Sequence, residues 1–328
     1  MSSSHPHILI FDTTLRDGGQ CRGTPLSPAE KLKVARQLAL LKVDVIEAGF
    51  PAACPDDLES LKEIAAEIRG CTLAGLARAR EEDIEPLARA LEKAESPRIH
   101  LFITVPKIKP GQPAVAQREA SVHSAVKAIE HARKYFTDIE FSPHNATRLE
   151  EDFLVELGEA AIGAGATTLN ISDTVGYAIP SEFGGLIRSL RKRISNIDQA
   201  ALSVHCHNDL GLAVANSLGA IQAGARQVEC AINGNGERAG NAALEEIAMA
   251  LNARRDVLGV RCRIDPARLA ETSRMVSEIT GYPVHRNKPI VGGSALDFDP
   301  EIFETGLARQ DFYEMIKAHK IGTQRKPE

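Results

Sequence analysis

Short apolar runs rich in β-branched residues recur along the chain, and each is followed by a segment whose apolar positions have helical spacing. The runs recur roughly every 25 to 40 residues, which is the spacing that repeated βα units require. On this pattern eight strands are predicted, at Ile8–Leu15, Val43–Phe50, Thr72–Ala77, Arg98–Val105, Asp138–Pro143, Thr167–Val175, Ala201–His207 and Gln227–Asn233.

The segments between the strands carry helix signals. Ser27–Leu41 begins with Ser-Pro-Ala-Glu, which supplies an N-cap, a proline in the first turn and an early acidic residue. Ser121–Tyr135 and Asp152–Gly163 have apolar residues at three- and four-residue steps. Eight such units predict an α/β fold, a (β/α)8 TIM barrel. A doubly wound sheet is the alternative, but no GxGxxG motif follows the first strand.

The βα rhythm stops near Val276. We therefore expect a catalytic barrel over residues 1–275 and a short C-terminal extension over 276–328, with no separate regulatory domain. Within the extension, Gly281-Tyr282-Pro283 predicts a turn. Asp299–Lys320 could form one or two helices, and 322–328 is expected to be disordered.

Composition narrows the possible partners and the compartment. The formal charge of the 328 residues is −5 with no basic block, which argues against nucleic-acid and membrane partners. The six cysteines form no CxxC pair, so neither a disulfide framework nor a structural zinc site is expected. No signal peptide or transmembrane stretch is evident. A cytoplasmic protein is the expectation.

Polar residues gather where the predicted strands end, and in this type of barrel the active site lies at the carboxyl ends of the strands. Any one of them could be structural, so the inference depends on their convergence. They are Arg16, Asp17, Glu47, His144, Asn145, Asp173, Thr174, His205, His207, Asn233 and Asn241.

His205 and His207 are two residues apart on one predicted strand, so their side chains face the same side. With Asp17 from the first strand they would form a two-histidine, one-carboxylate set for a divalent ion. The alternative is a pair of hydrogen-bonded core histidines. Arg16 beside Asp17 could donate to an oxygen that gains negative charge during the reaction. An ion pair with Glu47 or Asp173 is the structural alternative and is compatible with that role.

The glycine-rich loop from Asn233 to Asn241 allows the main chain to approach a ligand closely. On its own, this loop could equally be a simple turn before a helix.

Three motifs resemble one family: Phe11–Gly18 with Gln20, Val204–Gly211, and Asn235–Asn241. Together they are similar to the signatures of the metal-dependent acyl-CoA condensing enzymes, which include the 2-isopropylmalate, homocitrate and citramalate synthases. 3-Hydroxy-3-methylglutaryl-CoA lyase is a relative of these enzymes. The likeness covers roughly the first 295 residues, and the sequence is most similar to the 2-isopropylmalate synthases.

The resemblance implies that Asp17, His205, His207 and Asn241 hold Mn²⁺, Mg²⁺ or Zn²⁺. A 2-oxo acid would chelate the ion, Arg16 would polarise its carbonyl, and acetyl-CoA would be the co-substrate. The expected assembly is a homodimer. His144 and Glu237 are the further catalytic candidates, and the remaining substrate-binding candidates are Gln20, Glu47, Thr174 and Asn233.

The sequence departs from the family pattern at several positions. His144 stands where the synthases have a glutamate, and Gly19 replaces another glutamate. The run Gly293–Asp299 contains no histidine, whereas the synthases have a catalytic one there. Alternative functions therefore stay open: a homocitrate- or citramalate-type synthase or specialised paralogue, an acyl-CoA lyase or aldolase, or a non-catalytic barrel. Glu140, where homocitrate synthases often have an arginine, argues mildly against a dicarboxylic acceptor.

Overall fold

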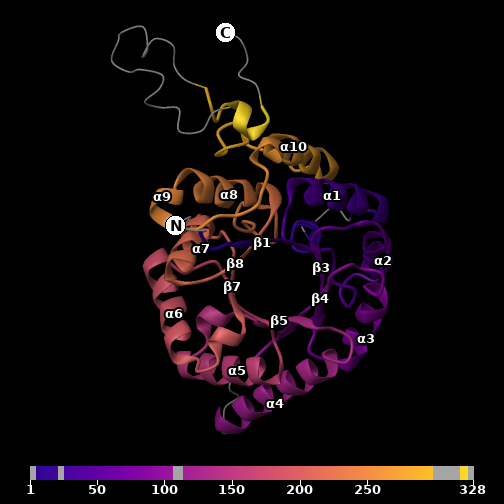
Figure 1. The fold of residues 1–328 in the computed structure, drawn as a ribbon, viewed down its shortest axis with the longest axis vertical. Helices are drawn as coiled ribbons and strands as arrows, with labels where there is room; N and C mark the ends of the chain where they lie inside the picture. Colours follow the sequence, from indigo (N-terminus) through magenta and orange to yellow (C-terminus); the bar gives the residue numbers. More distant parts are fainter. Residues whose placement is uncertain (1–4, 21–25, 106–113, 298–317, 324–328) are drawn as a thin grey trace.

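The computed structural model describes residues 5–20, 26–105, 114–297 and 318–323. Eight parallel strands close into a barrel in sequence order, and the last pairs with the first (Figure 1). The predicted (β/α)8 fold is confirmed. The strands are β1 (Leu9–Asp12), β2 (Val45–Glu47), β3 (Thr72–Arg78), β4 (Pro97–Ile103), β5 (Asp138–Pro143), β6 (Thr168–Asp173), β7 (Ala201–Cys206) and β8 (Gln227–Cys230).

Helices surround the barrel on the outside (Figure 1). The first of them begins as predicted, because the Ser27 side chain accepts a hydrogen bond from the amide of Glu30 and closes a capping box. The helices are α1 (Pro28–Leu41), α2 (Asp57–Glu67), α3 (Glu81–Ala90), α4 (Ala114–Ala132), α5 (Glu151–Ala164), α6 (Pro180–Arg193), α7 (Ala213–Ala223), α8 (Leu244–Ala253), α9 (Arg255–Leu258) and α10 (Leu269–Thr280).

Several strands end earlier than predicted. Strand β1 ends at Asp12, because the amides of Arg16 and Gly18 both donate to the Thr13 carbonyl and turn the chain. Arg16 and Asp17 therefore lie in the loop after β1. Strand β8 ends at Cys230 and is followed by a 3-10 turn over Ile232–Gly234.

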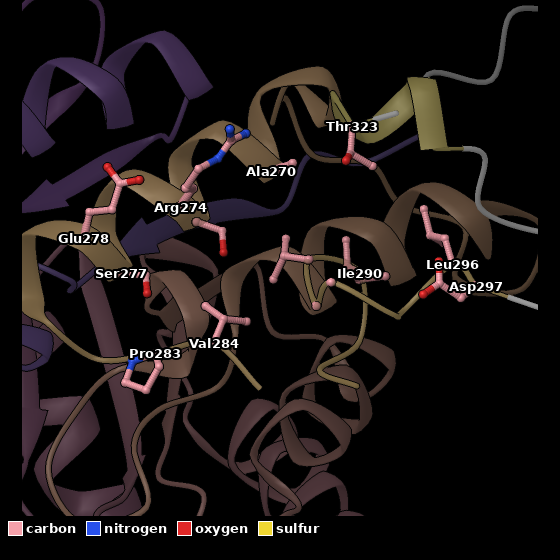
Figure 2. Close-up of a pocket in the computed structure, with 14 residues that line it drawn as sticks. Ala270, Arg274, Ser277, Glu278, Pro283, Val284, Ile290, Leu296, Asp297 and Thr323 are labelled. Atoms are coloured by element: carbon pink, nitrogen blue, oxygen red, sulfur yellow. The ribbon is translucent and has the colours of Figure 1, made fainter. Parts of the chain in front are cut away.

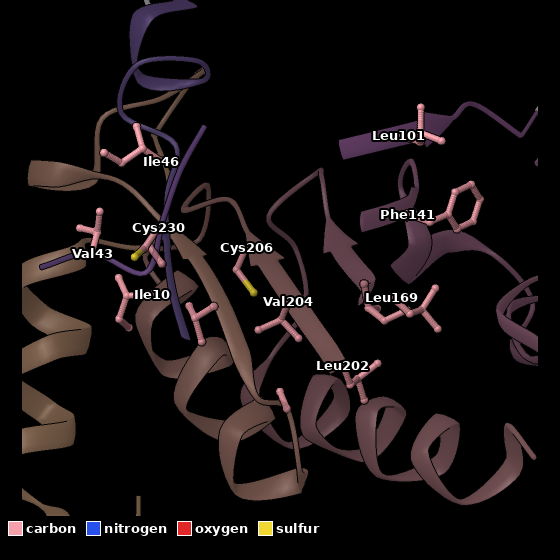
Figure 3. Packing of buried hydrophobic residues seen from close by; sticks show 14 of the residues in the cluster. Ile10, Val43, Ile46, Leu101, Phe141, Leu169, Leu202, Val204, Cys206 and Cys230 are labelled. Atoms are coloured by element: carbon pink, nitrogen blue, oxygen red, sulfur yellow. The ribbon is translucent and has the colours of Figure 1, made fainter. Parts of the chain in front are cut away.

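The two faces of the strands differ in chemistry. Outward-facing residues such as Val204, Leu202 and Phe141 form the apolar layer between barrel and helices (Figure 3). The inward face holds a small apolar cluster of Phe11, Val45 and Ala74 and is otherwise largely polar. Burial of the outer layer stabilises the fold, whereas the polar interior holds the side chains of the candidate site in place.

The polar interior is arranged in hydrogen-bonded levels. In the lower level Arg98 Nη1 donates to Glu140 Oε2 at 3.0 Å and to Gln227 Oε1 at 2.7 Å. In the level above, the His100 ring joins Glu47 and Ser142, at 2.7 Å from each. The candidate site lies over this second level.

After the barrel, α10 packs against α1, and the chain from 281 to 297 folds back beside it. Between α10 and this segment is a hollow of about 570 Å³ (Figure 2). Most of the range Asp299–Lys320, for which helices are predicted, lies outside the described residues. The described residues at its end begin the 3-10 turn Ala318–Ile321. None of the helices described is both long and apolar enough to cross a membrane.

Candidate metal and substrate site

The carboxyl ends of the strands surround a cavity of about 380 Å³. Larger hollows lie beside α10 and beside the glycine-rich loop, and Asn233 and Glu237 line the second of these. Most of the predicted polar residues instead line the smaller cavity. Its lining residues are Arg16, Asp17, Phe50, Leu76, His100, Phe102, Ser142, His144, Asn170, Ser172, Thr174, His205, His207, Glu229 and Glu237.

Asp17, His205 and His207 form a buried cluster whose ligand atoms all lie within 4.8 Å of one another. Oδ2 of Asp17 is 3.7 Å from Nε2 of His205 and 3.5 Å from Nε2 of His207. Although burial opposes ionisation, Arg16 and the two histidines hold the pKa of Asp17 well below its usual range. The carboxylate is therefore ionised, as a metal ligand must be.

The surroundings of the cluster also fit a divalent ion. Nδ1 of His205 bonds to Glu229 Oε2 at 2.8 Å, which leaves Nε2 directed at the cluster. A carboxylate behind a ligating histidine fixes the ring and its tautomer in this way. Three protein ligands with open positions suit an ion that also binds substrate.

Asn241 is a candidate fourth ligand. It forms an isolated β-bridge with His207, and its buried Oδ1 has no hydrogen-bond partner among the described residues. Its Nδ2 donates to the Asn235 carbonyl at 2.9 Å. A Cβ on Gly236 would lie 2.1 Å from this Nδ2 and 3.0 Å from Asp17 Oδ1, so the loop must have glycine there.

Arg16 is held in a cage of carboxylates. Its Nε donates to Glu47 at 2.6 Å, its Nη1 donates to Asp17 at 3.0 Å, and its Nη2 is 3.9 Å from Glu229. Of the two predicted ion-pair partners, the structure has Glu47, whereas the carboxylate of Asp173 accepts from Thr147 and from the Ala178 amide.

His100 is a site residue that the sequence reasoning missed. Burial opposes its charge, but Glu229 and Glu47 outweigh this effect and raise the pKa of His100 to about 9. It lies at the cavity floor as an imidazolium that bonds to Glu47. The available signal was its place on the inward face of β4, two residues from Arg98.

His144, Thr174 and Glu237 line the cavity, on three different loops. Burial lowers the pKa of His144, and His205 and His207 lower it further, whereas Glu237 raises it. The Glu237 amide donates to Asp17 Oδ1 at 3.0 Å, whereas its carboxylate is exposed. Thr174 accepts from the Asn145 amide.

Two predicted substrate contacts, Glu47 and Asn233, do not line the cavity, and the side chain of a third is outside the described residues. Glu47 is fully buried behind Arg16. Asn233 points away, toward α10, where its Oδ1 accepts from Ser273 Oγ at 2.6 Å. Gln20 ends the 3-10 turn Gly18–Gln20, and its side chain lies outside what the structure describes.

Comparison with known proteins agrees with this geometry. The HMGL-like family model matches residues 7–276. The 2-isopropylmalate synthase of Syntrophus aciditrophicus is 51% identical over 98% of this chain and 63% of its own length. That of Pyrococcus abyssi is 52% identical over 96% of this chain and 65% of its own. The chain thus spans just under two thirds of these relatives.

Two solved structures have the same fold at low identity. The HMG-CoA lyase of Bacillus subtilis has a TM-score of 0.69 at 21% identity and covers 86% of this chain and 96% of its own. The hydroxymethylglutaryl-CoA lyase of Pseudomonas aeruginosa has a TM-score of 0.70 at 20% identity, with the same coverage. The family model spans the whole barrel and every residue of the candidate metal cluster. The chain therefore belongs to the HMGL-like family.

Proposed function

We propose that this chain condenses acetyl-CoA with a 2-oxo acid, as a 2-isopropylmalate synthase does, at a divalent ion held by Asp17, His205, His207 and Asn241. The observation that carries the proposal is the meeting of this buried cluster with Arg16 at one cavity wall. The relatives at about 51% identity, named 2-isopropylmalate synthase, support it. Mn²⁺, Mg²⁺ and Zn²⁺ are the candidate ions.

Asp17, His205, His207 and Asn241 would hold the ion, which would supply Lewis acidity toward the bound oxo acid. Arg16 donates to the carbonyl oxygen, where negative charge develops as the carbonyl is attacked. Glu47 and Asp17 fix the guanidinium plane, so little reorganisation is needed during the reaction.

His144 is the proposed base that removes a proton from the acetyl methyl group. Its lowered pKa keeps the imidazole neutral and able to accept a proton at neutral pH. Glu237 lies on the same cavity and is the second acid–base candidate, for the water that later hydrolyses the thioester and releases CoA. Thr174, on the neighbouring loop, is a proposed substrate contact.

The cavity favours a monocarboxylic 2-oxo acid. Among the described residues, Arg16 and His100 are the strong cations that line it, and both are already paired with Glu47. Arg98 lies a level below and pairs with Asp138 and Glu140. No lining cation is thus left for a second carboxylate, whereas Phe50, Leu76 and Phe102 offer apolar contacts. This argues against a homocitrate-type acceptor.

A cytoplasmic homodimer is the proposed context. The five described cysteines are unpaired, as a reducing compartment would keep them. Light scattering coupled to gel filtration tests the dimer, and a monomer at micromolar concentration would contradict it.

The function is tested with His207→Ala and with His123→Ala, an exposed histidine on α4, as the matched control. Wild type and control should bind Mn²⁺ in calorimetry and release CoA from acetyl-CoA only when a monocarboxylic 2-oxo acid is present. His207→Ala should lose most metal affinity and turnover, because two ligands cannot hold the ion in one geometry. Full metal binding and activity in His207→Ala would show that the histidine pair is structural.

A further inference from the structure

Lys288 lies in the C-terminal segment, outside the barrel, but its ammonium group reaches the start of α8. Its Nζ is 2.7 Å from Oε1 of Glu246 and 3.2 Å from Oε1 of Glu245. The two carboxylates differ in burial, because Glu245 is 1% exposed and Glu246 is 22% exposed. The contact with Glu245 is therefore a buried ion pair, and removal of Lys288 would leave the buried Glu245 carboxylate without its cation.

The backbone around Lys288 is fixed by its own hydrogen bonds. The amide of Lys288 donates to the His285 carbonyl at 3.0 Å, and the Lys288 carbonyl accepts from Gly292 at 3.0 Å. A Cβ on Gly292 would lie 2.5 Å from the Lys288 carbonyl oxygen, so this close approach requires glycine. The lysine is thus presented by a compact turn beside the hollow shown in Figure 2.

Glu245 also contacts Asn233, at the start of the glycine-rich loop. Its second oxygen, Oε2, accepts from the Asn233 amide at 3.0 Å. Asn233 has a left-handed backbone with φ of 61°, which non-glycine residues seldom adopt without support. Its side chain also bonds twice to Ser273 of α10, so α8 and α10 hold it from two sides.

The loop that starts at Asn233 holds the candidate fourth ligand. The Gly234 carbonyl accepts from the Asn241 amide at 2.9 Å, and the Asn235 carbonyl accepts from Asn241 Nδ2, also at 2.9 Å. Farther along, the Glu237 amide donates to Asp17 Oδ1. A shift of Asn233 would therefore move both Asn241 and the amide that holds Asp17.

We propose that Lys288 and Glu245 form a positioning pair, which fixes the glycine-rich loop from outside the barrel and thereby sets the metal affinity of the site. Neither residue touches the cavity. The inference rests on the metal site of the proposed function and adds to it a dependence on the C-terminal segment. The competing view is that the pair merely docks this segment onto α8.

The test measures the Kd for Mn²⁺ by calorimetry, together with the Tm of each variant. Lys288→Met should weaken Mn²⁺ binding by about tenfold, as loss of an outer partner of a ligand commonly does. Adding Glu245→Gln should restore the affinity to within about threefold, because glutamine removes the charge and keeps an oxygen for the Asn233 amide. The matched control Glu246→Gln, which touches Lys288 but not the loop, should leave Kd within about twofold.

A second pair of variants keeps the test decisive if Lys288→Met fails to fold. Glu245→Leu with Lys288→Met is also neutral but cannot bond to the Asn233 amide, so it should bind Mn²⁺ about tenfold more weakly than Glu245→Gln with Lys288→Met. Equal affinity in these two double variants, or wild-type affinity in Lys288→Met, would overturn the inference. Failure of the wild type itself to bind Mn²⁺ would instead contradict the proposed function.

Discussion

Arg16 is oriented by Glu47, a buried carboxylate that does not line the cavity. Glu47 binds it through Oε2 and uses Oε1 for His100, which in turn bonds to Ser142. The guanidinium direction is therefore set by a chain that crosses the barrel from β2 to β5. A carboxyl-to-amide change at Glu47 would disturb catalysis through Arg16, although Glu47 itself is fully buried behind it.

His144 is the residue whose replacement is most informative. If it is the base, His144→Ala should lower kcat by roughly 10²–10⁴-fold with no loss of bound metal, because proton abstraction loses its acceptor. Burial lowers the pKa of His144, so the acidic limb of the wild-type profile of kcat against pH should have an apparent pKa below the usual histidine value of about 6.5. This limb should disappear in the variant. Steady-state kinetics from pH 5 to 8, together with metal analysis, checks this. A fall in kcat of only a few-fold would show that His144 packs in the site and is not the base.

At the scale of elements, the sequence was sufficient for the barrel because short apolar runs rich in β-branched residues and apolar positions at helical spacing are local signals. It also brought Asp17, His205 and His207 together, since parallel strands end at one face. It could not assign Asn233, whose direction depends on a left-handed backbone and on contacts with α10. It also missed His100, because a polar residue inside a strand does not reveal whether the interior it faces is polar.

Arg98 connects three strands through side chains, because it binds Asp138 and Glu140 of β5 and Gln227 of β8. Arg98→Met should lower the free energy of unfolding by about 3–5 kcal/mol, since it takes the cation from the buried carboxylate of Glu140 and from the partly exposed carboxylate of Asp138. Urea unfolding measures the loss. Adding Glu140→Gln should recover part of it by removing one of those charges. An Arg98→Met protein as stable as wild type would mean that Glu140 is already neutral in the folded barrel.

At the scale of the whole molecule, several carboxyl groups are withdrawn from water, and their ionisation is coupled to folding. Among the described residues, Asp12, Glu47, Glu140 and Glu245 are each at most 1% exposed. Most of them face a cation, but Asp12 bonds only to the amide and hydroxyl of Thr14. Its ionised form is therefore the least compensated, and the stability of the molecule should depend on it.

Burial raises the pKa of Asp12 from 3.8 to about 7. Below about pH 4 the group is protonated in both the folded and unfolded states. Between that pH and 7 only the folded state keeps the proton, so this group lowers stability progressively as the pH rises and then levels off. Asp12→Asn should thus gain stability over wild type from pH 5 to 7, by up to roughly 1.4 kcal/mol per pH unit.

Urea midpoints at pH 5, 6, 7 and 8 measure this difference, with Asp198→Asn, an exposed aspartate, as the control. The control should follow the wild type at every pH. Parallel curves for Asp12→Asn and wild type would show that Asp12 titrates normally in the folded state.

The candidate ligands lie on both sides of the place where the barrel closes. Asp17 follows β1, and His205 and His207 come from β7 and its end, about 190 residues later in the sequence, with β8 between them. An ion held by these residues would link the loop after β1 to β7, across the place where β8 pairs with β1 and closes the barrel. Because such an ion would bind only the closed barrel, it would make separation of β1 from β8 rarer by mass action. Cellular proteases act on the opened form, so the lifetime of this protein would follow the supply of the metal.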